Sequence, residues 1–142
     1  MPSRKKSSEG PALPAAVRAR ITAARQGLLV LHKALLDYER IRFERIHGRV
    51  ESSGAFLQLV LNDPHFAWLR PVSELVVQMD RVLASDEPGA EVDADMIMTQ
   101  AGTLLRADEE GQGFGRQYHR ALQESPDVVL AHAQWKRAAQ AK

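Results

Sequence analysis

The feature that most constrains this chain is an apolar stripe within residues 14–46, a segment whose only proline is its first residue. The stripe recurs every three or four positions, at Val17, Ile21, Ala24, Leu28, Leu31, Leu35 and Tyr38. This spacing brings side chains onto one face of an α-helix. Pro14 suits a first helical turn, and Gly48 suits the position just after a last one. The stripe therefore predicts one long helix of about 50 Å.

The stripe is interrupted at Arg42, where the next apolar residue is due. We expect Ile41 and Ile46 to continue the apolar face at a shifted phase. A coiled coil requires its repeat to persist over at least three heptads, so we favour a long bundle helix and keep a coiled-coil dimer as the alternative. Gly27, in the middle of the pattern, predicts either a close helix approach or a bend.

Two prolines divide the stretch LNDPHFAWLRP, residues 61–71. Asp63 before Pro64 is a helix start signal, a capping carboxylate followed by a residue whose missing N–H is not needed. Pro71 prevents uninterrupted helix, because its ring would clash with the carbonyl four residues earlier. We expect one short turn over residues 64–69 with Phe66 and Leu69 inward, then helix as far as residue 83, which together form a proline-kinked third helix.

The other segments also predict helices. Ser53 is the expected N-cap of a short second helix. Residues 84–95 form an acidic loop with proline and glycine, after which Asp93 or Asp95 is expected to cap the next helix. Ser125 before a proline predicts the start of the last helix. No segment shows the alternation that a strand requires, so we predict an all-α helical bundle.

The length and composition fit one helical-bundle domain over residues 13–142, preceded by a flexible basic tail over residues 1–12. The chain contains no cysteine, which excludes disulfides and thiolate metal sites. Its longest uncharged apolar run, GLLVL, is far shorter than the roughly 20 residues of a membrane-spanning helix. We read no secretory signal in the amino terminus. We therefore expect a cytoplasmic protein without membrane contact.

Nucleic-acid binding is a minor alternative. It would rely on the basic run Arg4 to Lys6 in the tail, together with the arginines of the first helix, Arg18, Arg20 and Arg25. The formal net charge is only +1, whereas nucleic-acid binding draws on many phosphate contacts from lysine and arginine. The charge balance argues against this class.

Ordinary enzyme signatures are absent from the sequence. The run GQGFG, residues 111–115, follows acidic residues rather than a strand and lacks the third glycine of a dinucleotide fingerprint, so we interpret it as a helix break. We expect no cofactor and lean away from an enzyme.

A metal-binding or cofactor-binding bundle is the alternative from another class. Glu44 and His47 are spaced as E-x-x-H, which places a carboxylate and an imidazole on adjacent turns as in di-metal carboxylate bundles. Such a site needs further ligands, for which His32 and His65 are the candidates. Only one such pair is present, which makes the signal weak.

Partner binding is indicated by aromatic residues near helix junctions. Trp68 and Arg70 flank the proline corner, and Trp135 lies near the carboxyl terminus. Aromatic and arginine side chains are enriched at binding hot spots, but either tryptophan would serve equally well in a core. Exposure would mark a contact surface.

The stretches LHKALLDYERIRFERIHG, residues 31–48, and LVLNDPHFAWLRPVSELVVQMD, residues 59–80, resemble a family of small uncharacterised bacterial proteins. The resemblance covers about half the chain. It implies an all-helical bacterial cytosolic protein and no particular activity. It also directs attention to the polar and aromatic residues in those stretches, His32, Asp37, Glu39, Asp63, Trp68 and Arg70.

The function that we expect is therefore protein–protein association, including self-association, through an apolar helix face without catalysis. If His32, Asp63 and Trp68 were to meet in one cavity, an enzyme would again have to be considered.

Overall fold

The computed structural model describes residues 13–140. Over this range the chain forms six α-helices and one 3₁₀-helix without any strand, which confirms the all-α prediction. The elements are α1 (Ala15–His47), α2 (Ser53–Asn62), η1 (Pro64–Leu69), α3 (Arg70–Ala84), α4 (Ala90–Leu104), α5 (Phe114–Glu124) and α6 (Pro126–Gln140). The basic tail predicted for residues 1–12 lies outside the described residues. No helix within residues 13–140 combines the length and the apolar character needed to cross a bilayer.

The long first helix is confirmed as α1, which has 33 residues between Pro14 and Gly48. The predicted stripe is its buried face, apart from Val17, which is only partly buried. The predicted continuation through Ile41 and Ile46 is wrong, because these side chains are 52% and 66% exposed. The buried face continues instead through Glu39 and Phe43.

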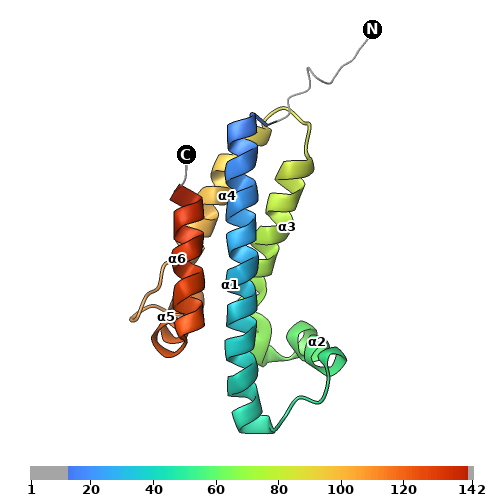
Figure 1. Ribbon diagram of the computed structural model, residues 1–142, viewed down its shortest axis with the longest axis vertical. Coiled ribbons are helices and arrows are strands. Elements are labelled where there is room, and N and C mark those ends of the chain that lie inside the picture. The colour runs from blue at the N-terminus through green and yellow to red at the C-terminus, as the bar shows by residue number, and fades with distance from the viewer. Residues whose placement is uncertain (1–12, 141–142) are drawn as a thin grey trace.

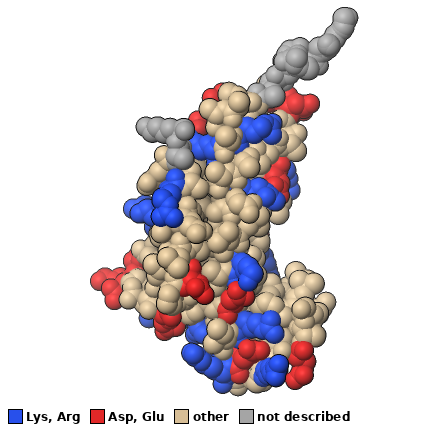
Figure 2. Space-filling view, viewed as in Figure 1, with Lys and Arg blue, Asp and Glu red and all other residues tan. Residues whose placement is uncertain are grey.

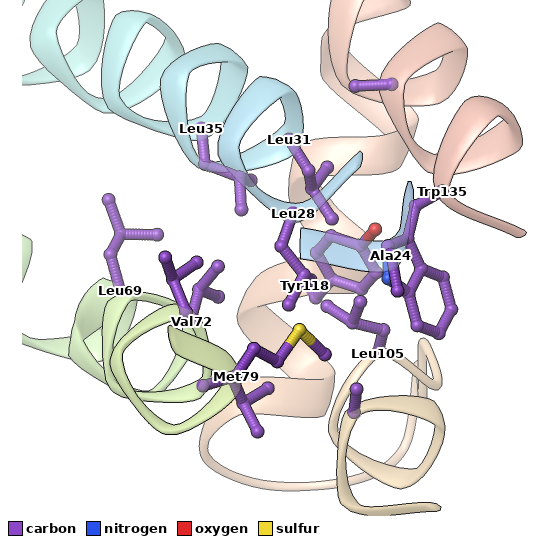
Figure 3. Packing of buried hydrophobic residues seen from close by; sticks show 14 of the residues in the cluster. Ala24, Leu28, Leu31, Leu35, Leu69, Val72, Met79, Leu105, Tyr118 and Trp135 are labelled. Atoms are coloured by element: carbon purple, nitrogen blue, oxygen red, sulfur yellow. The ribbon is translucent and has the colours of Figure 1, made fainter. Parts of the chain in front are cut away.

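The other helices pack around α1, which runs the full length of the molecule (Figure 1). Helix α6 lies along one side and α3 along another, while α4 packs on both α3 and α1. Figure 3 shows Leu28 and Leu31 of α1 directed toward Met79 of α3 and Tyr118 of α5. These side chains belong to one hydrophobic core.

Gly27 marks a close approach of α1 and α6. A Cβ atom placed on Gly27 would lie 3.1 Å from the Cα of Trp135, which is tighter than an ordinary van der Waals contact. Of the two predictions for Gly27, a close helix approach or a bend, the structure therefore supports the close approach.

The proline-kinked third helix is confirmed as η1 followed directly by α3. Asp63 caps η1, since its Oδ1 accepts a hydrogen bond of 2.9 Å from the backbone N–H of His65. Phe66 and Leu69 are buried as expected, with 2% and 1% exposed. The change from 3₁₀ to α geometry at Arg70 lets the chain turn without losing the helical path.

Several expected boundaries are wrong. Helix α2 is capped by Ser52 rather than Ser53, since the side chain of Ser52 accepts from the backbone N–H of Ala55. The acidic loop is shorter than predicted, because Gly89 adopts φ 94° and α4 begins at Ala90. A left-handed glycine therefore starts this helix instead of an aspartate cap.

Candidate functional site

The most polar part of the interior surrounds the carboxylate of Glu39, which is 0% exposed. Its Oε1 lies 2.7 Å from Nη1 of Arg42 and 2.8 Å from Nε2 of His65. Its Oε2 lies 2.9 Å from Nε1 of Trp68 and 3.1 Å from Nη2 of Arg120. We call these five residues the Glu39 cluster.

Three elements supply the Glu39 cluster. Glu39 lies four residues after Leu35 on the buried face of α1. The start signal before Pro64 begins η1, and residues three apart are eclipsed in a 3₁₀-helix, so His65 and Trp68 face the same carboxylate. Arg120 comes from α5, far along the chain. The cluster therefore fixes η1 and α5 against α1.

The carboxylate of Glu39 accepts hydrogen bonds from Arg42, Trp68 and Arg120. The Nε2 of His65 lies beside the same carboxylate, and its hydrogen bond of 3.3 Å joins the backbone carbonyl of Glu39. The two arginines also balance the buried negative charge, as a buried ion needs. We interpret the cluster as an interlock that positions helices.

A chain of hydrogen bonds extends from the Glu39 cluster to Tyr38. The hydroxyl of Tyr38 donates to Oε1 of Glu124 at 2.6 Å and accepts from Nε of Arg120 at 3.2 Å. Burial raises the pKa of Tyr38, and the hydrogen bond to Glu124 raises it further, while Arg120 opposes the shift. The hydroxyl therefore keeps its proton and ties α1 to the end of α5.

Sequence reasoning missed Arg42, Arg120 and Glu124 as partners in this network. The one available signal was the position of Glu39, a charged residue in the buried phase of the stripe, where it needs partners. Glu39, His65 and Trp68 all lie in the two stretches that carry the family resemblance.

The candidate metal ligands occupy different surroundings. The side chain of Glu44 accepts a hydrogen bond from the backbone N–H of Val50, His47 is exposed, and His65 belongs to the Glu39 cluster. His32 is partly buried, and this burial lowers its pKa. Among residues 13–140 no group of three or more histidine, aspartate or glutamate side chains is placed to hold a metal ion.

The candidate partner-binding residues divide into buried and exposed positions. Trp135 is 5% exposed and lies in the core against Gly27. Trp68 is partly buried, and its indole N–H is taken by Glu39. Arg70 is exposed and donates to the carbonyl of Leu61 at 3.4 Å.

The convergence of His32, Asp63 and Trp68 on one site is not observed. Asp63 caps η1, and Trp68 reaches Glu39. Within the described part of the chain, no hydrogen bond joins His32 to either of them.

Two of the arginines considered for nucleic-acid contact make surface contacts with α3. Arg18 donates to the carbonyl of Leu83 at 3.0 Å, and Arg25 pairs with Asp80. Arg20 is exposed. The run Arg4 to Lys6 lies outside the described residues.

A second buried polar pair joins α5 to α6. The hydroxyl of Tyr118, a residue with 0% exposure, lies 2.6 Å from Nδ1 of His132. Burial raises the pKa of Tyr118, whereas burial and the nearby charge of Lys136 lower the pKa of His132. Both shifts favour neutral side chains, with the phenol as donor and the imidazole as acceptor. The pair therefore acts as a neutral link between two helices.

The surface feature that stands apart is α2. This helix of ten residues, SGAFLQLVLN, contains no charged residue, and none of its residues is buried. Leu57 and Leu61 are 55% and 57% exposed. Figure 1 shows α2 projecting from the side of the bundle, and Figure 2 shows an uncharged area there beside the mixed charges at the end of α1.

A groove of about 630 Å³ runs between α2 and the end of α1. Phe43 and Val50 line it from the side of α1 and the following link, and Leu59 lines it from α2. We call α2 together with this groove the α2 surface. The sequence predicted this helix, whereas the exposure of Leu57 and Leu61 is a finding of the structure.

Comparisons with protein-family models, with curated proteins and with solved structures find no match to this chain. The site is therefore assigned on geometry alone.

Proposed function

We propose that this protein is a non-catalytic association module that binds another polypeptide through the α2 surface. The observation that carries the proposal is the exposed outer side of α2 in the described structure: the helix has no charged residue and no buried residue, and two of its leucines are more than half exposed. Contiguous apolar surface on a helix of this kind is typical of a protein–protein contact.

The contrast with the other helices supports this choice. Within residues 13–140 every other helix buries at least two of its residues, and each of the other five α-helices also carries charged side chains. Val92 on α4 and Leu130 on α6 are similarly exposed, but those helices bury another face in the core. Scattered apolar residues of that kind are normal on a protein surface.

The attachment of α2 also favours binding. Phe56, Leu59 and Val60 are partly buried against the core, so the helix is held in place while Leu57 and Leu61 remain outside. At its end, η1 is fixed by the Glu39 cluster. A preorganised surface loses less conformational entropy on binding than a mobile one.

The hydrogen bonds of the Glu39 carboxylate to Arg42, Trp68 and Arg120 support a structural role for the most polar site. We also propose that the protein works in the cytoplasm of a bacterial cell. The lack of cysteine fits a reducing compartment, and the family resemblance implies a bacterial source.

The proposal is tested by site-specific crosslinking, which the cysteine-free sequence makes simple. A single cysteine at position 61, Leu61→Cys, is labelled with a photoreactive benzophenone. The matched control is Leu130→Cys on α6, whose parent leucine is 63% exposed against 57% for Leu61. We expect crosslinks to a protein, whether a second copy or another polypeptide, from position 61 and not from position 130. Equal crosslinking at both positions, or none at 61, would refute the proposal.

A further inference from the structure

We propose that the polypeptide covering α2 is a second copy of this chain, with the two α2 helices packed antiparallel across a two-fold axis. This inference rests on the proposed function, because it names the partner of the same surface.

The solvent-facing residues of α2 form one continuous stripe. Gly54, Leu57, Gln58 and Leu61 are all exposed, and they follow the i, i+3, i+4, i+7 spacing of a single helix face. This face lies beside the partly buried one that Phe56, Leu59 and Val60 turn toward the core. Helix α2 therefore packs one apolar side against its own bundle and exposes a second apolar side to solvent.

The stripe is self-complementary when two copies of α2 are paired antiparallel. In an antiparallel pair centred between Leu57 and Gln58, the side chain of Leu61 lies opposite Gly54 of the other copy. Leu57 then lies opposite Gln58, whose methylene groups it contacts. The contact of the large Leu61 with the small Gly54 occurs twice, because a two-fold axis repeats every contact.

Within the described residues, the space beside Gly54 is open. A Cβ atom placed on it would have only Ser52 Oγ nearby, at 3.9 Å. Glycine weakens a helix relative to alanine, so a glycine in the first turns of a short exposed helix carries a cost without an internal benefit. Space for a leucine from outside is the benefit that the pairing supplies.

Charge is consistent with a second copy. A two-fold axis brings side chains near it close to their own equivalents, so a charged residue there would meet a like charge. Helix α2 contains no such residue.

The size of the surface sets the expected strength. A ten-residue helix with a flanking groove is smaller than the roughly 800 Å² per partner of a standard stable interface. We therefore expect a weak dimer with a dissociation constant on the order of micromolar.

Light scattering coupled to size exclusion, and sedimentation equilibrium over about a hundred-fold range of concentration, test this dimer. We expect the wild-type chain to pass from monomer to dimer. Gly54→Gln fills the space for the opposing leucine and should weaken dimerisation by about tenfold or more. Because glutamine is a good helix former and the site is open, the melting temperature of its monomer should be unchanged or higher.

Leu57→Asp places two carboxylates near the axis and should also abolish the dimer, while Leu130→Asp on α6 should leave it intact. A wild-type chain that stays monomeric throughout would overturn the dimer, as would a dimer that withstands both Gly54→Gln and Leu57→Asp. If position 61 nevertheless crosslinks to a different protein, the association function stands and only the second copy is excluded. If position 61 crosslinks to nothing, both proposals fail.

Discussion

The indole N–H of Trp68 donates a hydrogen bond of 2.9 Å to the buried carboxylate of Glu39. The two residues are 29 positions apart and belong to η1 and α1. Trp68 therefore serves as an anchor between elements, and its ring lies 5.3 Å from that of Phe114 at the start of α5. The proline corner that holds Trp68 is placed by this contact, and α2 is attached directly ahead of that corner.

Removing the carboxylate should destabilise the fold strongly. Glu39→Ala removes the acceptor of Arg42, Trp68 and Arg120, and leaving a donor in such a site unsatisfied costs about 1–3 kcal/mol. Urea unfolding monitored by circular dichroism measures the change. Asp37→Ala is the control, because its pair with Lys33 is exposed and is worth about 0.5 kcal/mol or less. Equal effects for the two variants would contradict the interlock.

The α1–α6 contact predicts opposite outcomes at two helical glycines. Gly27→Val should destabilise by about 1–3 kcal/mol, because the new side chain meets the backbone of Trp135. Gly102→Ala should instead stabilise by up to about 1 kcal/mol, since a Cβ there meets nothing within 4 Å. Thermal and urea unfolding distinguish the two. A neutral Gly27→Val would show that the helices can separate without loss.

Two partly buried histidines predict a fall in stability under mildly acidic conditions. The pKa of His32 and of His132 is lowered in the folded protein, whereas both titrate near 6.5 when unfolded. The unfolded chain then binds protons more readily, so the contribution of these groups to the unfolding free energy is complete above about pH 6.5. It falls as the pH drops from there through the folded-state pKa values.

The measurement is urea unfolding at about pH 7.5 and about pH 5, for the wild type and for a variant with His32→Gln and His132→Gln. Carboxylates titrate in the same range, so the difference between the two proteins is the readout. We expect the variant to lose less stability on acidification. An identical loss would show that these imidazoles titrate alike in the folded and unfolded chains.

Local patterns in the sequence were sufficient for most of the helices. The apolar spacing from Ile21 to Leu35 gave α1, and Asp63 before Pro64 gave the start of η1, because both signals act within one or two turns. The predicted start of α4 was wrong because Gly89 turns the chain in a left-handed conformation just before the helix begins. Asp93 and Asp95 fit the sequence pattern of an N-cap but lie inside the helix.

Contacts between distant elements could not be predicted in this way. Arg120 reaches Glu39 across 81 positions, and no local pattern marks either residue as the partner of the other. Trp68 and Trp135 look alike in sequence, but one reaches a carboxylate and the other fills the space beside Gly27. Whether a leucine on α2 faces the core or the solvent likewise depends on where the whole helix is attached.

The most direct test of the account measures the distance between two copies of α2. A spin label on Ser53→Cys, an exposed position of α2 outside the stripe, in a chain without other cysteines, reports this distance by double electron–electron resonance. Packed helices have axes about 8–10 Å apart, so we predict a narrow distance distribution below about 30 Å that disappears in Gly54→Gln. A label on Leu130→Cys should give only longer or broader distances. Absence of any short distance at position 53, at concentrations where the labelled chain is dimeric, would contradict the pairing of α2 with its own copy.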